Sequence, residues 1–359
     1  MHNLAINRLA LVSTIFASVV VLLGAWTRLV DAGLGCPDWP GCYGFFSVPT
    51  TSEEIATAEM RFPDAPVEVA KGWPEMIHRY FASSLGLLII GLTILSIRER
   101  KKERLVASSS TGSNSAPLKH CIALLILVIC QGLFGMWTVT LKLWPQVVSL
   151  HLIGGFTTLS LLYLLYLRTS PSARTKADKI NRPEWLSRLN KLAIIALVLV
   201  GVQIFLGAWT ASNYAALACG SDFPTCQSSM WPEMNFAGGF NFFQAIGPNY
   251  LGGLFDNESR VAIQMTHRIG ALIVTLFLAY LLWAMKSLTK QLSHKQHRAA
   301  KWVLIFLLAQ LLLGVSNVIW LIPLSIAVAH NGMGAVLLLS LVNLNYQLRC
   351  DPLTNKNTE

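Results

Sequence analysis

The chain has 359 residues, of which 53% are hydrophobic and only 13% are charged. This apolar surface exceeds what one soluble core could bury, which excludes a soluble globular protein and indicates an integral membrane protein. The formal net charge of +10 would suggest a nucleic-acid partner in a soluble protein, so the positions of the basic residues decide its meaning.

Eight apolar runs are each long enough to cross roughly 30 Å of hydrocarbon as a helix. In chain order, the predicted spans are 9–27, 77–97, 119–140, 148–167, 192–211, 261–285, 302–320 and 323–346. The first run is long for a secretory signal and is followed by no clear cleavage site. We therefore expect it to remain as a membrane helix.

Lysine and arginine gather in alternate connections of the chain. Segments 98–119, 168–191 and 286–301 are rich in them, whereas 29–74 and 213–260 are poor. The positive-inside rule then places both termini in the cytoplasm. The sequence predicts an all-α integral membrane protein with eight spans, and it excludes nucleic acid as a partner.

The second half of the chain repeats motifs of the first. The matching stretches are Gly24-Ala25-Trp26-Thr27 with Gly207-Ala208-Trp209-Thr210, Glu75-Met76-Ile77-His78-Arg79 with Gln264-Met265-Thr266-His267-Arg268, and Gln131 to Gly135 with Gln310 to Gly314. This predicts two parallel-repeat four-helix bundles, at 1–170 and 190–350. A charged linker, 171–189, and a cytoplasmic tail, 351–359, complete the predicted domains.

Four histidines are predicted near the outer ends of the even-numbered spans: His78, His151, His267 and His330. One such histidine could simply satisfy a helix-packing hydrogen bond. Four at equivalent positions favour function, because ionisable groups inside a bilayer are costly. Facing imidazoles in a bundle suit haem iron, whereas zinc would need more ligands. The sequence therefore predicts two haem sites, one in each half.

Glu75 lies one helical turn before His78 and on the same face, and Gln264 takes its place in the second half. A carboxylate can exchange protons or stabilise positive charge, which an amide of similar shape cannot. If one half carries out chemistry and the other only holds a cofactor, the difference indicates that the first half is the catalytic one. The alternative for Glu75 is a favourable charge at the start of a helix.

Charged and sulfur side chains flank these positions. Arg79 and Arg268 directly follow histidines, where each could pair with a haem propionate or with a lipid headgroup.

Cysteines come in pairs in the two outer loops, and an oxidising periplasm favours disulfides at these spacings: Cys36 with Cys42, and Cys219 with Cys226. The first pair is either redox-active or structural, and the second is interpreted as a structural link.

The sequence resembles the haem A synthase family, membrane enzymes that convert haem O to haem A for terminal oxidases. The resemblance covers essentially all eight spans and includes Thr27-Arg28-Leu29, Gly33 to Cys42 and Glu75 to Arg79. It implies that His78 and His151 face the substrate haem, with Glu75 catalytic beside the methyl group that is oxidised. It also implies that His267 and His330 ligate a haem b cofactor. Arg28 becomes a third predicted propionate contact.

The family resemblance implies oxidation of a porphyrin methyl to a formyl group, with water as the source of oxygen. It predicts a bacterial inner-membrane protein with haem sites toward the periplasm. The expected partners are haem O, the lipid bilayer, haem O synthase, a quinone or other electron acceptor, and a second copy of the chain. The alternative is a bis-histidine transmembrane cytochrome b that passes electrons from quinol. It accounts for the histidines but not for the Glu75 and Gln264 difference. A transporter is disfavoured because the spans hold little mid-membrane charge.

Overall fold

The computed structural model describes residues 4–106, 116–170 and 183–350, and this part of the chain is helical without named strands. Eight of its helices are long and apolar enough to cross a membrane. All eight predicted spans fall on these helices. Only the predicted spans 302–320 and 323–346 extend past their helices, each by one residue. The predicted tail 351–359 and residues 171–182 of the predicted linker lie outside the described residues.

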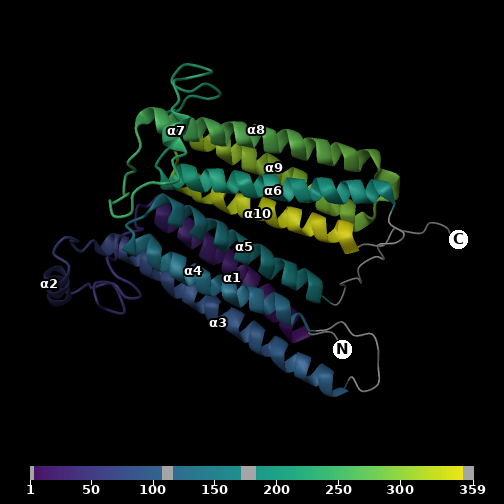
Figure 1. The fold of residues 1–359 in the computed structure, drawn as a ribbon, viewed down its shortest axis with the longest axis horizontal. Coiled ribbons are helices and arrows are strands. Elements are labelled where there is room, and N and C mark those ends of the chain that lie inside the picture. The colour runs from purple at the N-terminus through teal and green to yellow at the C-terminus, as the bar shows by residue number, and fades with distance from the viewer. Residues whose placement is uncertain (1–3, 107–115, 171–182, 351–359) are drawn as a thin grey trace.

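Figure 1 shows the long helices in two groups. The first group contains α1 (Leu4–Leu29), α3 (Val69–Val106), α4 (Leu118–Thr140) and α5 (Pro145–Thr169). The second contains α6 (Glu184–Ser212), α8 (Asn257–Ser287), α9 (His294–Ile319) and α10 (Leu324–Cys350). Short helices lie between them: α2 (Ser52–Arg61), α7 (Phe236–Gly239) and the 3₁₀ turn η2 (Thr289–Gln291). Helix α6 begins at Glu184, inside the segment predicted as linker.

Each group is a ring of four helices around a common axis. In the first, α1 and α4 both pack against α3 and α5, so α3 and α5 lie diagonally opposite each other. In the second, α6 and α9 both pack against α8 and α10, which makes α8 and α10 the diagonal pair. Each ring encloses its own buried apolar cluster. The diagonal helices are the ones that carry the four predicted ligands.

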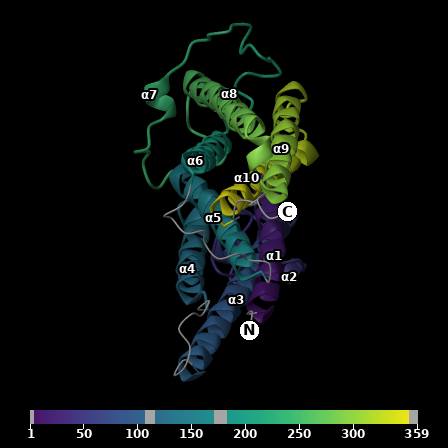
Figure 2. The same ribbon diagram turned by 90° about the vertical axis from the view of Figure 1, so that its right-hand side faces the viewer.

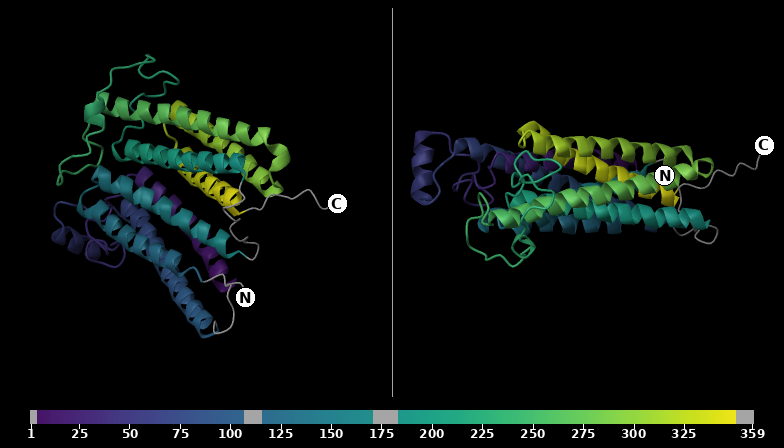
Figure 3. Two further views of the ribbon diagram at one scale, coloured as in Figure 1. Left: turned by 45° about the vertical axis from the view of Figure 1, so that its right-hand side comes forward. Right: turned by 90° about the horizontal axis from the view of Figure 1, so that it is seen from above.

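The two rings meet along α1 and α5 of the first group and α6 and α10 of the second. Figures 2 and 3 show these helices stacked at the centre of the molecule. The approach is close, because a Cβ atom on Gly332 of α10 would lie 2.8 Å from Cδ2 of Leu22 on α1. A hydrogen bond of 3.1 Å joins the hydroxyls of Ser149 on α5 and Ser212 on α6. Small and polar residues at such a junction are typical of helix packing in membranes.

The short helices α2 and α7 lie at one end of the bundle (Figure 1). Loop 30–51 and loop 213–235 also share backbone features at this end. Asp31 and Tyr214 have positive φ angles, and so do Tyr43 and Gln227. Isolated β-bridges join Cys42 to Phe45 and Cys226 to Ser229. The two long outer loops therefore begin with closely similar folds, each placed over the end of one helix ring.

Asp256 is the N-cap of α8, the helix that carries His267, and its carboxylate accepts a 2.7 Å hydrogen bond from the Ser259 amide. Hydrogen bonds from Ser259 lower the pKa of Asp256 below its ordinary value. A carboxylate with a lowered folded-state pKa stabilises the protein at neutral pH, and this contribution is lost as the pH falls through that pKa.

We expect Asp256→Ala to reduce the free energy of unfolding by about 1 kcal/mol, because the Ser259 amide loses its acceptor. Asp256→Asn is the control, since its amide oxygen can still accept this bond. The measurement is the melting temperature of the purified protein in detergent. Equal melting temperatures for Asp256→Ala and the parent chain at neutral pH would contradict the capping role.

Candidate functional site

The four histidines lie within the first three turns of their helices, at the end of the bundle that carries α2 and α7. The ring centroids of His78 and His151 are 6.4 Å apart, and the ring planes are nearly perpendicular at 89°. Two imidazoles on opposite sides of one metal have ring centres roughly 6 Å apart, because each metal–nitrogen bond is about 2 Å. The structure thus brings these two predicted ligands to a separation that one iron could bridge.

A glycine on a neighbouring helix faces each of the four imidazoles. A Cβ atom on these glycines would lie 2.9 Å from His78 Cε1 at Gly24, 3.5 Å from His151 Cε1 at Gly135, 3.2 Å from His267 Cε1 at Gly207 and 3.1 Å from His330 Cε1 at Gly314. Three of these distances are shorter than ordinary van der Waals contacts. Because these residues have no side chain, the four imidazoles have space to lie near the bundle axes.

Each imidazole has at least one ring nitrogen without a hydrogen-bond partner among the described residues, although Nε2 of His330 lies 3.4 Å from Nε2 of Gln310. Nδ1 is buried without a hydrogen-bond partner in His78, His151 and His330. In His267, Nδ1 lies 3.0 Å from Nε2 of Gln203, which leaves the other ring nitrogen for a ligand. For His267 to bind iron through Nε2, its proton must sit on Nδ1, with the Gln203 amide oxygen turned to accept it. Buried, unpaired imidazole nitrogens fit a haem iron that would bind them.

No cluster of three or more His, Cys, Asp or Glu side chains that could hold a metal occurs within the described ranges. A bare zinc ion in a structural site takes four protein ligands, and in a catalytic site it takes three. A haem needs only axial ligands, because its porphyrin supplies the other four. Paired imidazoles in each ring of helices are therefore better suited to haem than to a bare ion.

Glu75 is buried, with 4% of its surface exposed, and both carboxylate oxygens are engaged. Oε1 forms an ion pair with Arg79, and Oε2 accepts a 3.0 Å hydrogen bond from the Cys36 amide. Charge-assisted bonds of this kind are among the stronger hydrogen bonds in proteins. The carboxylate is thus fixed in place one turn from His78.

The outer loop beside Glu75 is closed by a disulfide between Cys36 and Cys42, and the matching loop by one between Cys219 and Cys226. An aspartate organises each loop from within. Asp38 accepts hydrogen bonds from the amides of Tyr43 and Gly44, and Asp222 accepts one from the amide of Ser228. Burial, and then the negative charge of Glu68, raises the pKa of Tyr43. The Tyr43 hydroxyl therefore stays neutral and donates to the Pro66 carbonyl at 2.9 Å.

The arginines that follow the two histidines differ in how they are used. Arg79 donates to the carbonyls of Asp38 and Gly41 as well as to Glu75. Arg268 donates to the Thr225 carbonyl at 2.9 Å, while its Nε and Nη2 are buried without partners. The second half therefore keeps guanidinium donors for an anion, whereas Arg79 is committed to the protein.

Arg28, the third predicted propionate contact, links the two halves. Its Nη2 donates to the Ala211 carbonyl of α6 at 2.7 Å, and its guanidinium carbon lies 4.1 Å from the ring centre of Tyr214. Nη1 pairs with Asp31 at 3.2 Å. Only Nε of Arg28 is buried without a partner.

Sequence reasoning did not assign roles to the four glycines or to Gln203. The repeated stretch at Gly24 and Gly207 was visible, but nothing in it showed that these glycines face imidazoles. Gln203 lies four residues before Gly207, and Val20 lies four residues before Gly24. This second difference between the halves is visible when the repeated motifs are compared. The contact between Gln203 and His267 could not be predicted from the sequence.

Eight spans in two rings, each with a diagonal pair of histidines, define a multi-pass helical membrane protein with paired intramembrane imidazoles. The family model for COX15-CtaA, described as cytochrome oxidase assembly protein, matches residues 7–342, and the chain belongs to this family.

Several relatives with the name Heme A synthase are similar to this chain. That of Shewanella oneidensis is 42% identical over 341 residues, covering 94% of each chain. That of Agrobacterium fabrum is 29% identical over 343 residues, covering 89% of this chain and 83% of the relative. That of Chelativorans sp. is 28% identical over 349 residues, covering 90% and 85%. These matches agree with the predicted family and give no support to the electron-carrier alternative.

The equivalent positions of Arg79 and Arg268 allow a matched test. We expect Arg79→Gln to destabilise the protein by roughly 3 kcal/mol, because it leaves the Glu75 carboxylate buried without its cation. The two side chains are only 12% and 6% exposed, so solvent screens the pair little. Arg268→Gln removes no carboxylate partner and is expected to have a smaller effect.

Melting temperatures of the purified variants measure this difference. The double variant Glu75→Gln/Arg79→Gln is expected to recover part of the stability lost in Arg79→Gln, since it removes the unpaired charge. Equal losses for Arg79→Gln and Arg268→Gln, with no recovery in the double variant, would show that the ion pair does not stabilise the site.

Proposed function

We propose that this protein is a haem A synthase, an oxidoreductase that converts a methyl group of haem O to the formyl group of haem A. Family membership and the names of its relatives support this activity. The observation that carries the proposal is the His78 and His151 pair, with rings 6.4 Å apart and the buried Glu75 one turn away. An acidic group one turn from paired imidazoles supports a role for Glu75 beside a bound haem substrate.

In this proposal, haem O binds in the first ring of helices between His78 and His151. Glu75 acts as a fixed negative charge that stabilises positive character at the methyl carbon as electrons leave. The ion pair with Arg79 and the hydrogen bond from the Cys36 amide support this electrostatic role, because both stabilise the ionised carboxylate. Arg79 is then a positioning residue that holds Glu75 against the outer loop.

Oxidation of methyl to hydroxymethyl removes two electrons and two protons and adds one oxygen, for which we propose water as the source. Oxidation of hydroxymethyl to formyl removes two further electrons and two protons. The electrons must pass to an acceptor outside the chain, and a membrane quinone is the proposed class. The burial of Glu75, at 4% exposure, supports a site with little access for bulk water, which would protect the reacting carbon from side reactions.

We propose haem b as the cofactor of the second half, with His267 and His330 as its iron ligands. When bound, haem b supplies one-electron transfer. Three features of the described residues support the fit: the space at Gly207 and Gly314, the unpaired Nδ1 of His330, and the free donors of Arg268. Those Arg268 donors are suited to a propionate.

The proposed location is the bacterial inner membrane, with the haem sites toward the periplasm. The basic residues support this orientation, because they cluster at the end of the bundle opposite α2 and α7. The disulfides support it too, since the oxidising side favours them. Delivery of haem O by haem O synthase and assembly of more than one copy belong to the same proposal.

Glu75→Gln tests the catalytic assignment. Expressed with a source of haem O, this variant is expected to form haem A at least about a hundredfold more slowly, because the fixed charge is lost. Chromatography of the extracted haems measures haem A, haem O and haem b together. The control is Glu68→Gln, which removes an exposed carboxylate that pairs with Lys71 at 2.8 Å. Unchanged haem A with Glu75→Gln would remove Glu75 from the mechanism.

Gly207→Val tests the cofactor half. A side chain at this position would occupy the space beside the His267 ring, so bound haem b is expected to fall several-fold. Gly201→Val, on the same helix, is the matched control, because a Cβ atom there meets nothing within 4 Å. The readout is the haem b content per protein from absorption spectra. Full haem b retention in Gly207→Val would contradict the assigned ligand geometry.

A further inference from the structure

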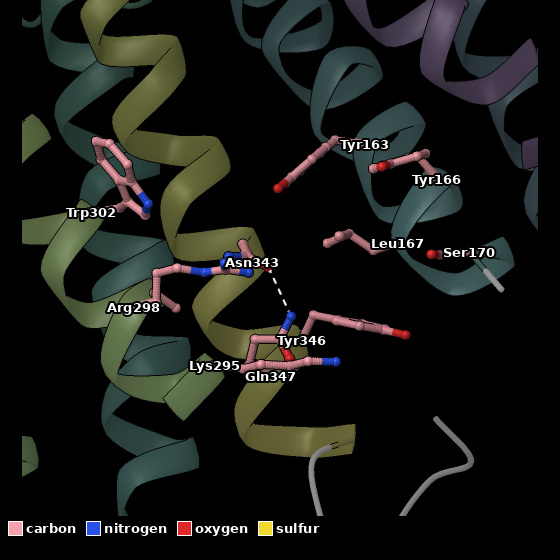
Figure 4. A pocket seen from close by; sticks show the side chains of 11 residues that line it. Tyr163, Tyr166, Leu167, Ser170, Lys295, Arg298, Trp302, Asn343, Tyr346 and Gln347 are labelled. Carbon is pink, nitrogen blue, oxygen red and sulfur yellow. Dashed lines mark hydrogen bonds between the residues drawn. The ribbon is translucent and has the colours of Figure 1, made fainter. Parts of the chain in front are cut away.

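The end of the molecule opposite α2 and α7 contains a cavity that the proposed function does not use. Its volume is about 310 Å³, and residues of α5, α9 and α10 line it. Figure 4 shows α5 on one side and α9 on the other, with α10 between them. The cavity therefore lies where the first half meets the second.

One wall of the cavity is positively charged. Lys295 and Arg298 of α9 are one helical turn apart, and both line it. None of its described lining residues is acidic. Across the described ranges, neither cation has an ion pair with a carboxylate. Two neighbouring cations without a carboxylate form a site for an anion.

Aromatic residues continue the cavity toward the middle of the membrane. Trp302 lies one turn beyond Arg298 on α9, and its ring is stacked on Phe306 at a centroid distance of 5.3 Å. Across the cavity on α5, Tyr163 and Tyr166 are stacked at 6.2 Å, and Figure 4 shows the Tyr163 hydroxyl directed into the space between the helices. Cations at the rim and aromatic rings further in match an amphiphile with an anionic head.

We propose that this cavity binds the headgroup of an anionic membrane phospholipid, with its phosphate at Lys295 and Arg298 and the start of an acyl chain along Trp302. Basic cavities between membrane helices at the cytoplasmic surface are suited to such headgroups. A free phosphate ion would occupy only a small part of the volume and would leave the aromatic wall without a partner. The bound lipid bridges α5 of the first half and α9 of the second.

A ligand that binds only the folded protein raises its melting temperature, and the rise grows with the logarithm of the ligand concentration once this exceeds the dissociation constant. The test uses the purified full-length protein in a neutral detergent, titrated with short-chain phosphatidylglycerol. Parallel titrations use short-chain phosphatidylcholine and inorganic phosphate. We expect phosphatidylglycerol alone to raise the melting temperature progressively with its concentration.

The test variant is Lys295→Gln/Arg298→Gln. Each cation near an anionic headgroup contributes about fivefold to affinity at low ionic strength, so the variant should bind phosphatidylglycerol roughly 25-fold more weakly. The matched control is Lys191→Gln/Lys301→Gln. It removes two exposed lysines of α6 and α9 that do not line the cavity, and it should bind like the parent chain.

Each outcome bears on the proposal. Selective loss of the phosphatidylglycerol effect in Lys295→Gln/Arg298→Gln supports it, provided that the lipid-free melting temperature is unchanged. An equal effect of phosphatidylcholine would show that charge does not matter, and an equal effect of inorganic phosphate would assign the site to a free anion. Either result, or equal weakening in the control variant, would overturn it. The synthase activity is not part of this test, so its outcome is independent of the proposed function.

Discussion

The rest of the structure depends on the packing of each imidazole against a glycine of a neighbouring helix. His78 packs on Gly24, and His267 packs on Gly207. A Cβ atom at either glycine would lie closer to the imidazole than an ordinary van der Waals contact. Such contacts let polar rings reach the axis of an apolar bundle without separating its helices. The two histidines of each ring lie on helices diagonally opposite each other, so both imidazoles can approach the same bundle axis. The membrane helices therefore serve as a frame for two pairs of ligands.

The two halves use one scaffold for different chemistry. In the first, Glu75 forms an ion pair with Arg79 and accepts a hydrogen bond from the outer loop. In the second, the uncharged Gln264 has its Oε1 buried without a partner, and Nε and Nη2 of Arg268 also remain unpartnered. The carboxylate of the first half thus occurs with a closed ion pair, and the amide of the second half occurs with an open guanidinium. The first arrangement holds a negative charge, and the second offers a positive one to a ligand.

Much of this fold could be predicted from the sequence because the bilayer imposes simple rules. Long apolar runs gave the eight spans, and the spacing of the histidines placed them at one depth. The commitment of Arg79 to the carbonyl of Gly41 could not be predicted, because it depends on how a loop 38 residues away folds. The contact between Gln203 and His267, 64 residues apart, is similar. Local pattern determines which face a residue occupies, but tertiary packing determines its partner.

The disulfide loop over Glu75 also has a structural explanation that needs no redox cycle. Cys36 contributes its backbone amide to the Glu75 carboxylate, and the bond to Cys42 closes the loop that presents this amide. Arg79 binds carbonyls of the same loop from the other side. A crosslink of this kind restricts the loop before the site forms, so less conformational entropy is lost when the donors converge. The covalent link and the ion pair therefore hold one carboxylate from two directions.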